Sequence, residues 1–221
     1  MALVEPWQLA PPHPTARPFL IGAAILFLLG LLLAHWLAWL SFFCILLTLY
    51  FFRDPERVAP DREGVLLAPA DGRVVSVAAT VPPAELGLGA APRWRVATFL
   101  SFLDVHVNRI PADGTITRIV YRHGRFRNAA DRDAAATNEQ NAIAIRLLDG
   151  REIAVVQIAG LIARRIVCSV REGDAVAAGA RFGIIRFGSR TDLYLPEGAA
   201  PLVSEGQTMI GGETVIAQLD R

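Results

Sequence analysis

The chain has 221 residues, a formal net charge of +1 and 53% hydrophobic residues. This charge gives no basic field for a nucleic acid, and the hydrophobic content is too high for a wholly soluble protein of this length, so a membrane segment is expected. All 22 basic residues are arginine, because the sequence contains no lysine. A lysine amine is the group that holds pyridoxal phosphate, biotin or lipoate, so none of these can be attached to the chain.

The N-terminal part divides into a tail and an apolar segment. Residues 1–17 are rich in proline, show no periodicity and predict a flexible tail. Residues 18–52 contain no Asp, Glu, Lys or Arg. One helix of that length would measure about 50 Å, against a hydrocarbon core of about 30 Å. Because a histidine and two tryptophans lie near the middle, we expect two short helices, about 19–34 and 37–52, which form a membrane hairpin.

Arginines flank the apolar segment on both sides. Arg17 precedes it, and Arg53, Arg57 and Arg62 follow it. The positive-inside tendency therefore places both ends, and residues 53–221, on the cytoplasmic side of the cell membrane. One long tilted helix and a signal anchor are the alternatives to the hairpin, whereas a cleaved signal peptide would have a shorter apolar run.

The remainder, residues 53–221, has short apolar runs separated by Gly, Pro and Asp, which predicts a mainly β (α+β) domain. The polar stretch 126–140 predicts a long loop and a candidate lid. The expected strands cover residues 65–67, 72–79, 95–100, 106–110, 114–121, 142–147, 152–158, 166–170, 181–187 and 192–195.

Two internal repeats predict a quasi-symmetric sheet. Pro-Ala-Asp-Gly at 69–72 returns at 111–114, each time as a turn that leads into a strand, and the pattern of 170–179 returns at 203–212. The second repeat resembles the barrel-sandwich hairpins of biotinyl and lipoyl carrier domains. Those carriers need a lysine at a hairpin tip, so the fold class is predicted without the carrier function.

Three stretches contain reactive groups: Asp71 in its turn, His106 in an apolar strand, and Ser189 after Gly188. A hydroxyl that follows a glycine can attack the preceding carbonyl, because glycine leaves the approach open. Each group also has an ordinary interpretation. Asp71 would shape its turn through an Asx hydrogen bond, which is also the role expected for Asp113. His106 would be a histidine buried in the core, and Gly188-Ser189 would be a simple turn. A Ser-His-Asp set suggests a hydrolase, but Ser189 lacks the Gly-x-Ser-x-Gly elbow.

The histidines and cysteines do not indicate a metal site. The four histidines are scattered, without the spacing of zinc ligands. Cys44 and Cys168 have neither a partner nor a metal-binding spacing, so they are expected to be buried thiols in a reducing compartment.

Several short motifs stand in an order that is specific in combination, although each is weak alone. They are Tyr-Phe-Phe-Arg-Asp-Pro at 50–55, Ala-Pro-Ala-Asp-Gly at 68–72, Phe-Leu-Ser at 99–101, Asp-Val-His-Val-Asn-Arg at 104–109, Asn-Glu at 138–139 and Phe-Gly-Ser at 187–189. In this order the chain resembles the phosphatidylserine decarboxylase family, in its shorter bacterial and archaeal form, from residue 50 to about 219.

The resemblance implies a zymogen of phospholipid biosynthesis that cuts itself between Gly188 and Ser189. The pieces 1–188 and 189–221 would stay together as a heterodimer, and Ser189 would become a covalent pyruvoyl cofactor. The implied reaction is the decarboxylation of phosphatidylserine, a membrane phospholipid, to phosphatidylethanolamine and CO2. A lysine-free chain that makes its own carbonyl from serine agrees with this chemistry, since a carbonyl is the electron sink that decarboxylation needs.

The resemblance also assigns roles to Asp71 and His106, which match the aspartate and histidine of the family's self-processing set. Longer members have a second histidine where this chain has Arg109, and Leu-Gly-Ser-Thr where it has Phe-Gly-Ser-Arg. Because Arg109 is permanently charged, the processing work falls to His106, oriented or polarised by Asp71. Ser189 would attack the Gly188 carbonyl, His106 would remove the proton that lets the ester eliminate, and hydrolysis would leave the pyruvoyl group. His106 would later protonate the substrate α-carbon.

The alternative to an enzyme is a non-catalytic adaptor, anchored in the membrane, with a barrel-sandwich domain. It explains the repeats and the apolar N-terminus. It gives no reason for the presence of Asp71, His106 and Ser189 together.

Overall fold

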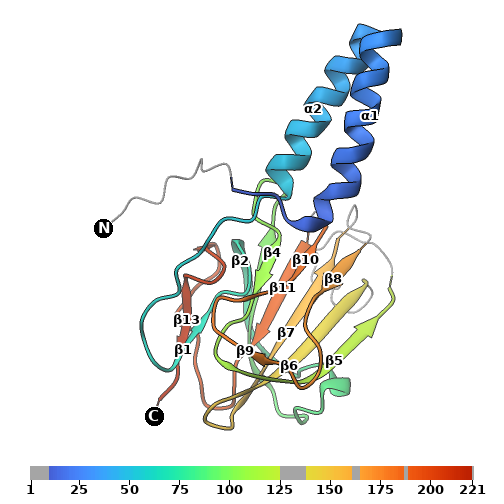
Figure 1. Cartoon of the computed structure of the whole chain (residues 1–221). Helices are drawn as coiled ribbons and strands as arrows, with labels where there is room; N and C mark the ends of the chain where they lie inside the picture. The colour runs from blue at the N-terminus through green and yellow to red at the C-terminus, as the bar shows by residue number, and fades with distance from the viewer. Residues whose placement is uncertain (1–9, 125–137, 161–164, 187–188, 221) are drawn as a thin grey trace. The chain divides into compact units, whose positions relative to one another are not determined.

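The computed structural model describes residues 10–124, 138–160, 165–186 and 189–220 (Figure 1). By their contacts, the residues form two compact units, Met1–Glu56 and Arg57–Arg221. Most of the predicted loop at 126–140 lies outside the described residues, as does Gly188.

The first unit is a pair of apolar helices, as the sequence predicted. They are α1 (Arg17–Leu33) and α2 (His35–Phe51), preceded by the short 3-10 helix η1 (Pro14–Ala16). Within the described residues, the stretch Pro14–Leu33 is long and apolar enough to cross a bilayer, while α2 is apolar but shorter. Cys44 lies exposed on α2, so the prediction of a buried thiol was wrong there.

A tight connection joins the two helices. Ala34 is extended, with φ −161°, and its N–H donates to the Gly30 carbonyl at 2.9 Å. A side chain at position 30 would place its Cβ 2.3 Å from the Ala38 nitrogen, so glycine is what lets the helices approach at this end. At the other end, the Phe52 carbonyl accepts a hydrogen bond from the His13 N–H at 2.7 Å.

The second unit is built from antiparallel strands, ten of which overlap the ten predicted ranges. The prediction missed β9, β12 and β13. The strands are β1 (Val65–Leu67), β2 (Gly72–Thr80), β3 (Arg93–Leu100), β4 (Val107–Arg109), β5 (Gly114–Arg122), β6 (Gln140–Leu147), β7 (Glu152–Ala159), β8 (Ile166–Cys168), β9 (Ala175–Val176), β10 (Arg181–Ile185), β11 (Ser189–Tyr194), β12 (Thr208–Met209) and β13 (Val215–Gln218), with the short helix η2 (Ala84–Leu86) after β2.

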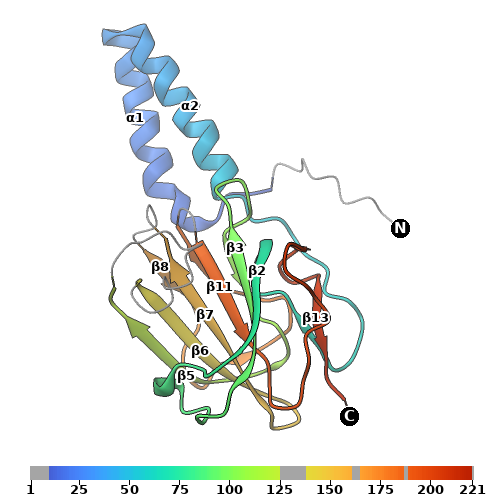
Figure 2. The ribbon, with the colours of Figure 1, turned by 180° about the vertical axis from the view of Figure 1, so that it is seen from behind.

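These strands form three sheets. The largest has eight strands in the order β12-β2-β3-β11-β7-β6-β5-β9, and Figure 2 shows how it curls, with β11 near its middle. A three-stranded sheet, β4-β10-β8, packs on its inner face, where Phe182 of β10 shares one apolar core with Ile143 and Val155. The strands β1 and β13 pair separately.

The two faces of β11 differ because side chains alternate along a strand. Leu193 belongs to the main core between the sheets, whereas Tyr194 belongs to a second cluster with Leu86 of η2. Ser189 and Thr191 therefore lie on the face of the main core. Arg190, Asp192 and Tyr194 lie on the opposite face.

The internal repeats form a pseudo-two-fold arrangement. Met209 of β12 pairs with Gly72, the first residue of β2, as Val176 of β9 pairs with Gly114, the first residue of β5. The hydrogen bonds repeat as well. The N–H of Gly206 donates to Val74, and the N–H of Gly173 donates to Ile116, each at 2.8 Å. Both Pro-Ala-Asp-Gly turns thus lead into strands as predicted, while the likeness to carrier barrel-sandwiches stays a prediction.

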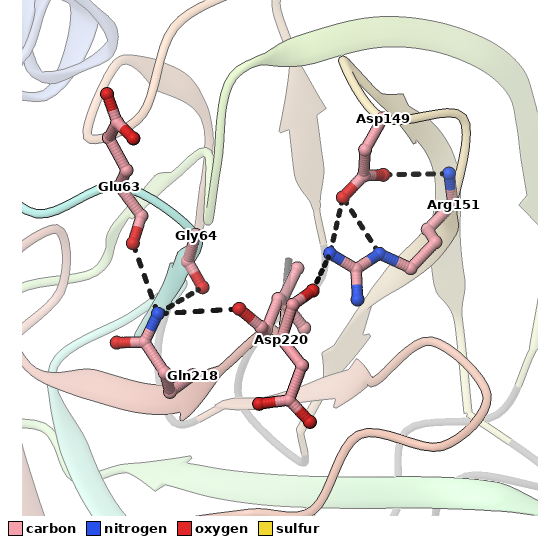
Figure 3. A network of polar contacts seen from close by, with 7 residues as sticks. Glu63, Gly64, Asp149, Arg151, Gln218 and Asp220 are labelled. Atoms are coloured by element: carbon pink, nitrogen blue, oxygen red, sulfur yellow. Dashed lines mark hydrogen bonds and ion pairs between the residues drawn. The ribbon is translucent and has the colours of Figure 1, made fainter.

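Polar contacts hold the C-terminal strand in place (Figure 3). The side-chain amide of Gln218 donates to the carbonyls of Glu63 at 3.1 Å and Gly64 at 3.2 Å. Arg151 pairs with Asp149 at 2.8 Å and donates to the Asp220 carbonyl at 3.0 Å. The Arg151 contact lowers the pKa of the Asp149 carboxyl.

Candidate active site

Ser189 is the first residue of β11, not part of a turn before it. It lies between Leu100 of β3 and Ala159 of β7. Its side chain is fully buried, and its hydroxyl has no hydrogen-bond partner among the described residues. Leaving a buried hydroxyl unpaired lowers the stability of the fold by about 1–3 kcal/mol, which makes Ser189 a candidate reactive group.

His106 is fully buried just before β4. Its Nδ1 lies 2.9 Å from the Asp104 carbonyl oxygen. The Asp104 carboxylate in turn accepts hydrogen bonds from the N–H and the hydroxyl of Ser101, both at 2.7 Å. The short segment after β3 is thereby fixed in shape, and it presents the imidazole in a defined orientation.

Two connections bring His106 to the same end of the sheet as Ser189. The segment that carries His106 starts at Leu100, which pairs directly with Ser189. On the other side, the His106 carbonyl accepts the N–H of Ile185 at 3.3 Å, only four residues before Ser189. Four residues span at most about 14 Å of chain, so the imidazole and the serine belong to one neighbourhood.

Asp71 lies in the turn between β1 and β2. Its carboxylate accepts the N–H of Gly211 at 2.8 Å and forms an ion pair with Arg57 at 2.7 Å. The first bond has a counterpart in the other repeat, where Asp113 accepts the N–H of Ala178 at 2.8 Å. Each aspartate thus ties its turn to a distant segment, and Asp71 has an ion pair in addition.

The register places this turn at the same end of the sheet as Ser189. Arg73 of β2 pairs with Phe99, which pairs with Arg190 of β11. Asp71 is therefore about two strand spacings, roughly 10 Å, from the start of β11 along the sheet. The described contacts link Asp71 to Arg57 and Gly211, and His106 to Asp104.

Arg109, which stands where longer relatives of the resembled family have a histidine, is buried. Its guanidinium donates to the Gly179 carbonyl at 2.8 Å, and its aliphatic chain fills the space beside Gly212, where a Cβ would lie 2.8 Å from the Arg109 Cδ. Arg109 thus packs between the two repeats.

The Asn-Glu motif at 138–139 has no role that the sequence alone predicts. The Asn138 side chain donates to the carbonyl of Ala159 at 2.8 Å, directly beside Ser189 in the sheet. The Glu139 carboxylate accepts the Tyr121 hydroxyl. Burial, followed by the hydrogen bond and charge of Glu139, raises the pKa of Tyr121 to about 12. The motif therefore secures the strand next to Ser189.

A buried ion pair follows Ser189 on the opposite face of β11. Arg190 binds Asp192 with two hydrogen bonds, at 2.6 and 2.7 Å, and the two side chains are 2% and 1% exposed. Burial alone would lower the pKa of Arg190, but the bonds and charge of Asp192 outweigh it and raise this pKa. Burial and then the Asp192 charge raise the pKa of Tyr194.

Comparison with known proteins decides the family. The family profile described as phosphatidylserine decarboxylase matches residues 45–217. The chain belongs to the phosphatidylserine decarboxylase family. A phosphatidylserine decarboxylase proenzyme of Granulibacter bethesdensis is 71% identical over 96% of this chain and 86% of its own length. Proenzymes of the same name from Gluconacetobacter diazotrophicus and Gluconobacter oxydans are 57% and 55% identical, over 99% of this chain and their whole length.

Membership of this family makes the chain a decarboxylase and supports a phospholipid substrate, in place of the adaptor alternative. In the part of the chain that the structure describes, no three His, Cys, Asp or Glu side chains are grouped as ligands for a metal ion.

Proposed function

We propose that the chain is a self-processing, pyruvoyl-dependent phosphatidylserine decarboxylase. It cuts itself between Gly188 and Ser189 and converts Ser189 into the pyruvoyl group. The observation that supports this most directly is the Ser189 hydroxyl, which is fully buried, unpaired among the described residues and at the same end of the sheet as a fully buried histidine. A serine hydrolase would place its nucleophile in a Gly-x-Ser-x-Gly elbow, which Ser189 lacks.

Ser189, His106 and Asp71 have different roles in the processing reaction. The Ser189 hydroxyl attacks the preceding carbonyl and converts the peptide bond to an ester. His106, oriented through Asp104, accepts the proton whose removal lets the ester eliminate. Asp71 acts at the same end of the sheet, and its ion pair with Arg57 at 2.7 Å fixes the position of the carboxylate.

In the mature enzyme, the pyruvoyl carbonyl supplies the electron sink for decarboxylation of an amine-bearing substrate. His106 donates the proton that replaces CO2 on the substrate α-carbon. The apolar helices of the first unit anchor the enzyme at the cytoplasmic face of the membrane, where a phospholipid is available without leaving the bilayer. The tail, the membrane segment and the catalytic domain correspond to residues 1–17, 18–52 and 53–221.

Intact-mass analysis of the purified chain tests the proposal. We expect two pieces that separate before position 189, and a small piece whose N-terminus is blocked. Ser189→Ala should remain a single inactive chain. An active wild-type protein that stays uncut, or activity in Ser189→Ala, would refute the proposal.

The repeat supplies a matched control for Asp71. Asp71→Asn and Asp113→Asn each remove the charge from an equivalent turn, and each leaves an amide oxygen that can still accept the equivalent N–H. We expect Asp71→Asn to slow the cut at least tenfold, while Asp113→Asn cuts at the wild-type rate. Equal rates for the two variants would show that Asp71 only shapes its turn.

A further inference from the structure

Formation of a pyruvoyl group consumes water. When the ester eliminates, the Ser189 Cβ–Oγ bond breaks, a base takes the Cα proton, and the Gly188 carboxylate departs. Position 189 is then a dehydroalanine, whose tautomer is an imine. Water adds its oxygen to the imine carbon and ammonia leaves, so each chain takes up one water. Because Ser189 is fully buried, this water has to be held inside the protein.

A polar seam crosses the apolar core beside Ser189. It consists of Thr98, Asn108, Asn141, Gln157 and Thr191, all at most 2% exposed. Asn141 donates to the Gln157 side-chain oxygen at 2.8 Å, and Gln157 donates to the Asn108 side-chain oxygen at 2.7 Å. The chain of amides therefore runs from β6 through β7 to β4 and joins the two packed sheets.

The register places the seam next to Ser189. Thr191 is two residues further along β11 on the same face, which puts the two side chains about 7 Å apart. Thr191 pairs with Thr98 on one side and Gln157 on the other, at about 5 Å between facing Cβ atoms. Asn108 of the polar seam lies in β4, two residues after His106.

The seam has hydrogen-bonding capacity left over. The hydroxyls of Thr98 and Thr191 and the side-chain nitrogen of Asn108 are buried, with no partner among the described residues, as is the hydroxyl of Ser189. A buried water makes about three hydrogen bonds to such groups, and it can bridge groups about 5 Å apart. If these positions only filled the core, valine would serve in place of threonine without the cost of an unpaired hydroxyl.

Gly183 of β10 leaves room for the side chains of the seam, because it has no side chain of its own. A Cβ there would lie 3.0 Å from the Gln157 side-chain nitrogen and 2.4 Å from the Val167 carbonyl oxygen. Gly183 pairs with Asn108, so β10 carries no side chain at the point where Gln157 donates to Asn108. A larger residue would push the amide chain out of place.

We propose that the polar seam holds a water molecule beside position 189, and that this is the water that converts the imine to the pyruvoyl group. The hydroxyls of Thr191 and Thr98 orient it, and the amide chain keeps those strands in register. This inference rests on the proposed self-processing. It assigns the seam to the hydrolytic step, after the cut.

The test separates the cut from the hydrolysis. The full chain is synthesised in a cell-free system with phospholipid vesicles, and samples taken over time are treated with borohydride. Borohydride reduces an imine to alanine and a pyruvoyl group to a lactyl group. Alanine gives a readable N-terminus in sequencing, whereas lactyl blocks it, and the two small pieces differ in mass by about 1 Da.

Thr191→Val and Thr98→Val keep the branched shape and remove the hydroxyl. We expect both to be cut, with conversion from the alanine-yielding to the lactyl-yielding form slowed about tenfold, the effect of losing one hydrogen bond to the water. Thr191→Ser should restore the rate. Thr117→Val, in β5 outside the seam, is the matched control, and its conversion should equal wild type.

Lactyl formation at the wild-type rate in both valine variants would overturn this inference but not the proposed function. A failure of both variants to be cut would also overturn it, because the seam would then act before the water step. A wild-type chain that is never cut would overturn the proposed function, and the inference with it.

Discussion

The buried pair of Arg190 and Asp192 gives a sharp test of the electrostatics around β11. Asp192→Asn keeps the shape of the side chain and removes its charge, so the Arg190 guanidinium stays buried without its counter-ion. Removing one member of a buried pair costs about 3–5 kcal/mol, far more than the pair contributes relative to apolar residues. With side chains 2% and 1% exposed and two bonds under 2.8 Å, this pair belongs to that class.

The measurement is urea unfolding of the chain in detergent, in a Ser189→Ala background so that every variant has the same covalent state. Of the four tryptophans, Trp94 in β3 is the one in the second unit, so it reports on the sheet. We expect Asp192→Asn to lower the free energy of unfolding by about 4 kcal/mol. Arg190→Met combined with Asp192→Leu should cost less than Asp192→Asn alone, because the buried Arg190 charge is removed, while Arg95, which lies 3.7 Å from Asp192, loses this ion pair in both variants.

The ion pair of Arg146 and Glu152 is the exposed control, with a distance of 3.3 Å and side chains 60% and 28% exposed. Glu152→Gln should cost less than about 1 kcal/mol. If Asp192→Asn cost no more than Glu152→Gln, the reasoning from burial would be refuted.

Two further predictions concern the sheet. The pKa of Tyr121 is about 12 in the folded protein and about 10 in the unfolded chain, so its contribution to stability is complete below pH 10 and is lost as the pH rises from about 10 to 12. The free energy of unfolding should therefore fall more steeply across this pH range for wild type than for Tyr121→Phe. Parallel pH dependences would contradict the assignment. Gly72→Ala should cost more than 3 kcal/mol, since φ is +139° and the new Cβ would lie 2.1 Å from the Phe99 carbonyl oxygen. Gly89→Ala, with φ +82° and open space, should cost about 1–2 kcal/mol in the same denaturation assay, and equal losses would show that the contact with Phe99 relaxes.

Alternating and apolar runs were sufficient to predict most strands. The prediction missed β9 and β12 because each has two residues, and such short strands exist only through pairing with distant turns. It began β11 at Asp192 rather than Ser189, because Ser-Arg-Thr-Asp is a polar sequence that is typical of a turn. Arg190 and Asp192 are buried despite their charges, since each neutralises the other within one strand.

The candidate site was predicted in part. Motif order pointed to Asp71, His106 and Ser189, and the structure places all three at one end of the sheet. Arg57 was missed as a partner because it lies 14 residues before Asp71, with no periodic pattern to connect them. The polar seam was missed because Thr98 and Gln157 are ordinary strand residues, and their burial depends on which strands pair.

The central position of β11 has a consequence for a chain that is cut before Ser189. The small piece would contribute a strand hydrogen-bonded on both sides, to β3 and β7, as well as β12 and β13. It could not leave without breaking the sheet in two, so the pieces would remain associated while the fold lasts. Once unfolded, however, they would be two separate molecules, and recovery of the enzyme would become a concentration-dependent encounter. After processing, refolding would thus no longer be a reaction within one chain, because it would require the two pieces to meet again.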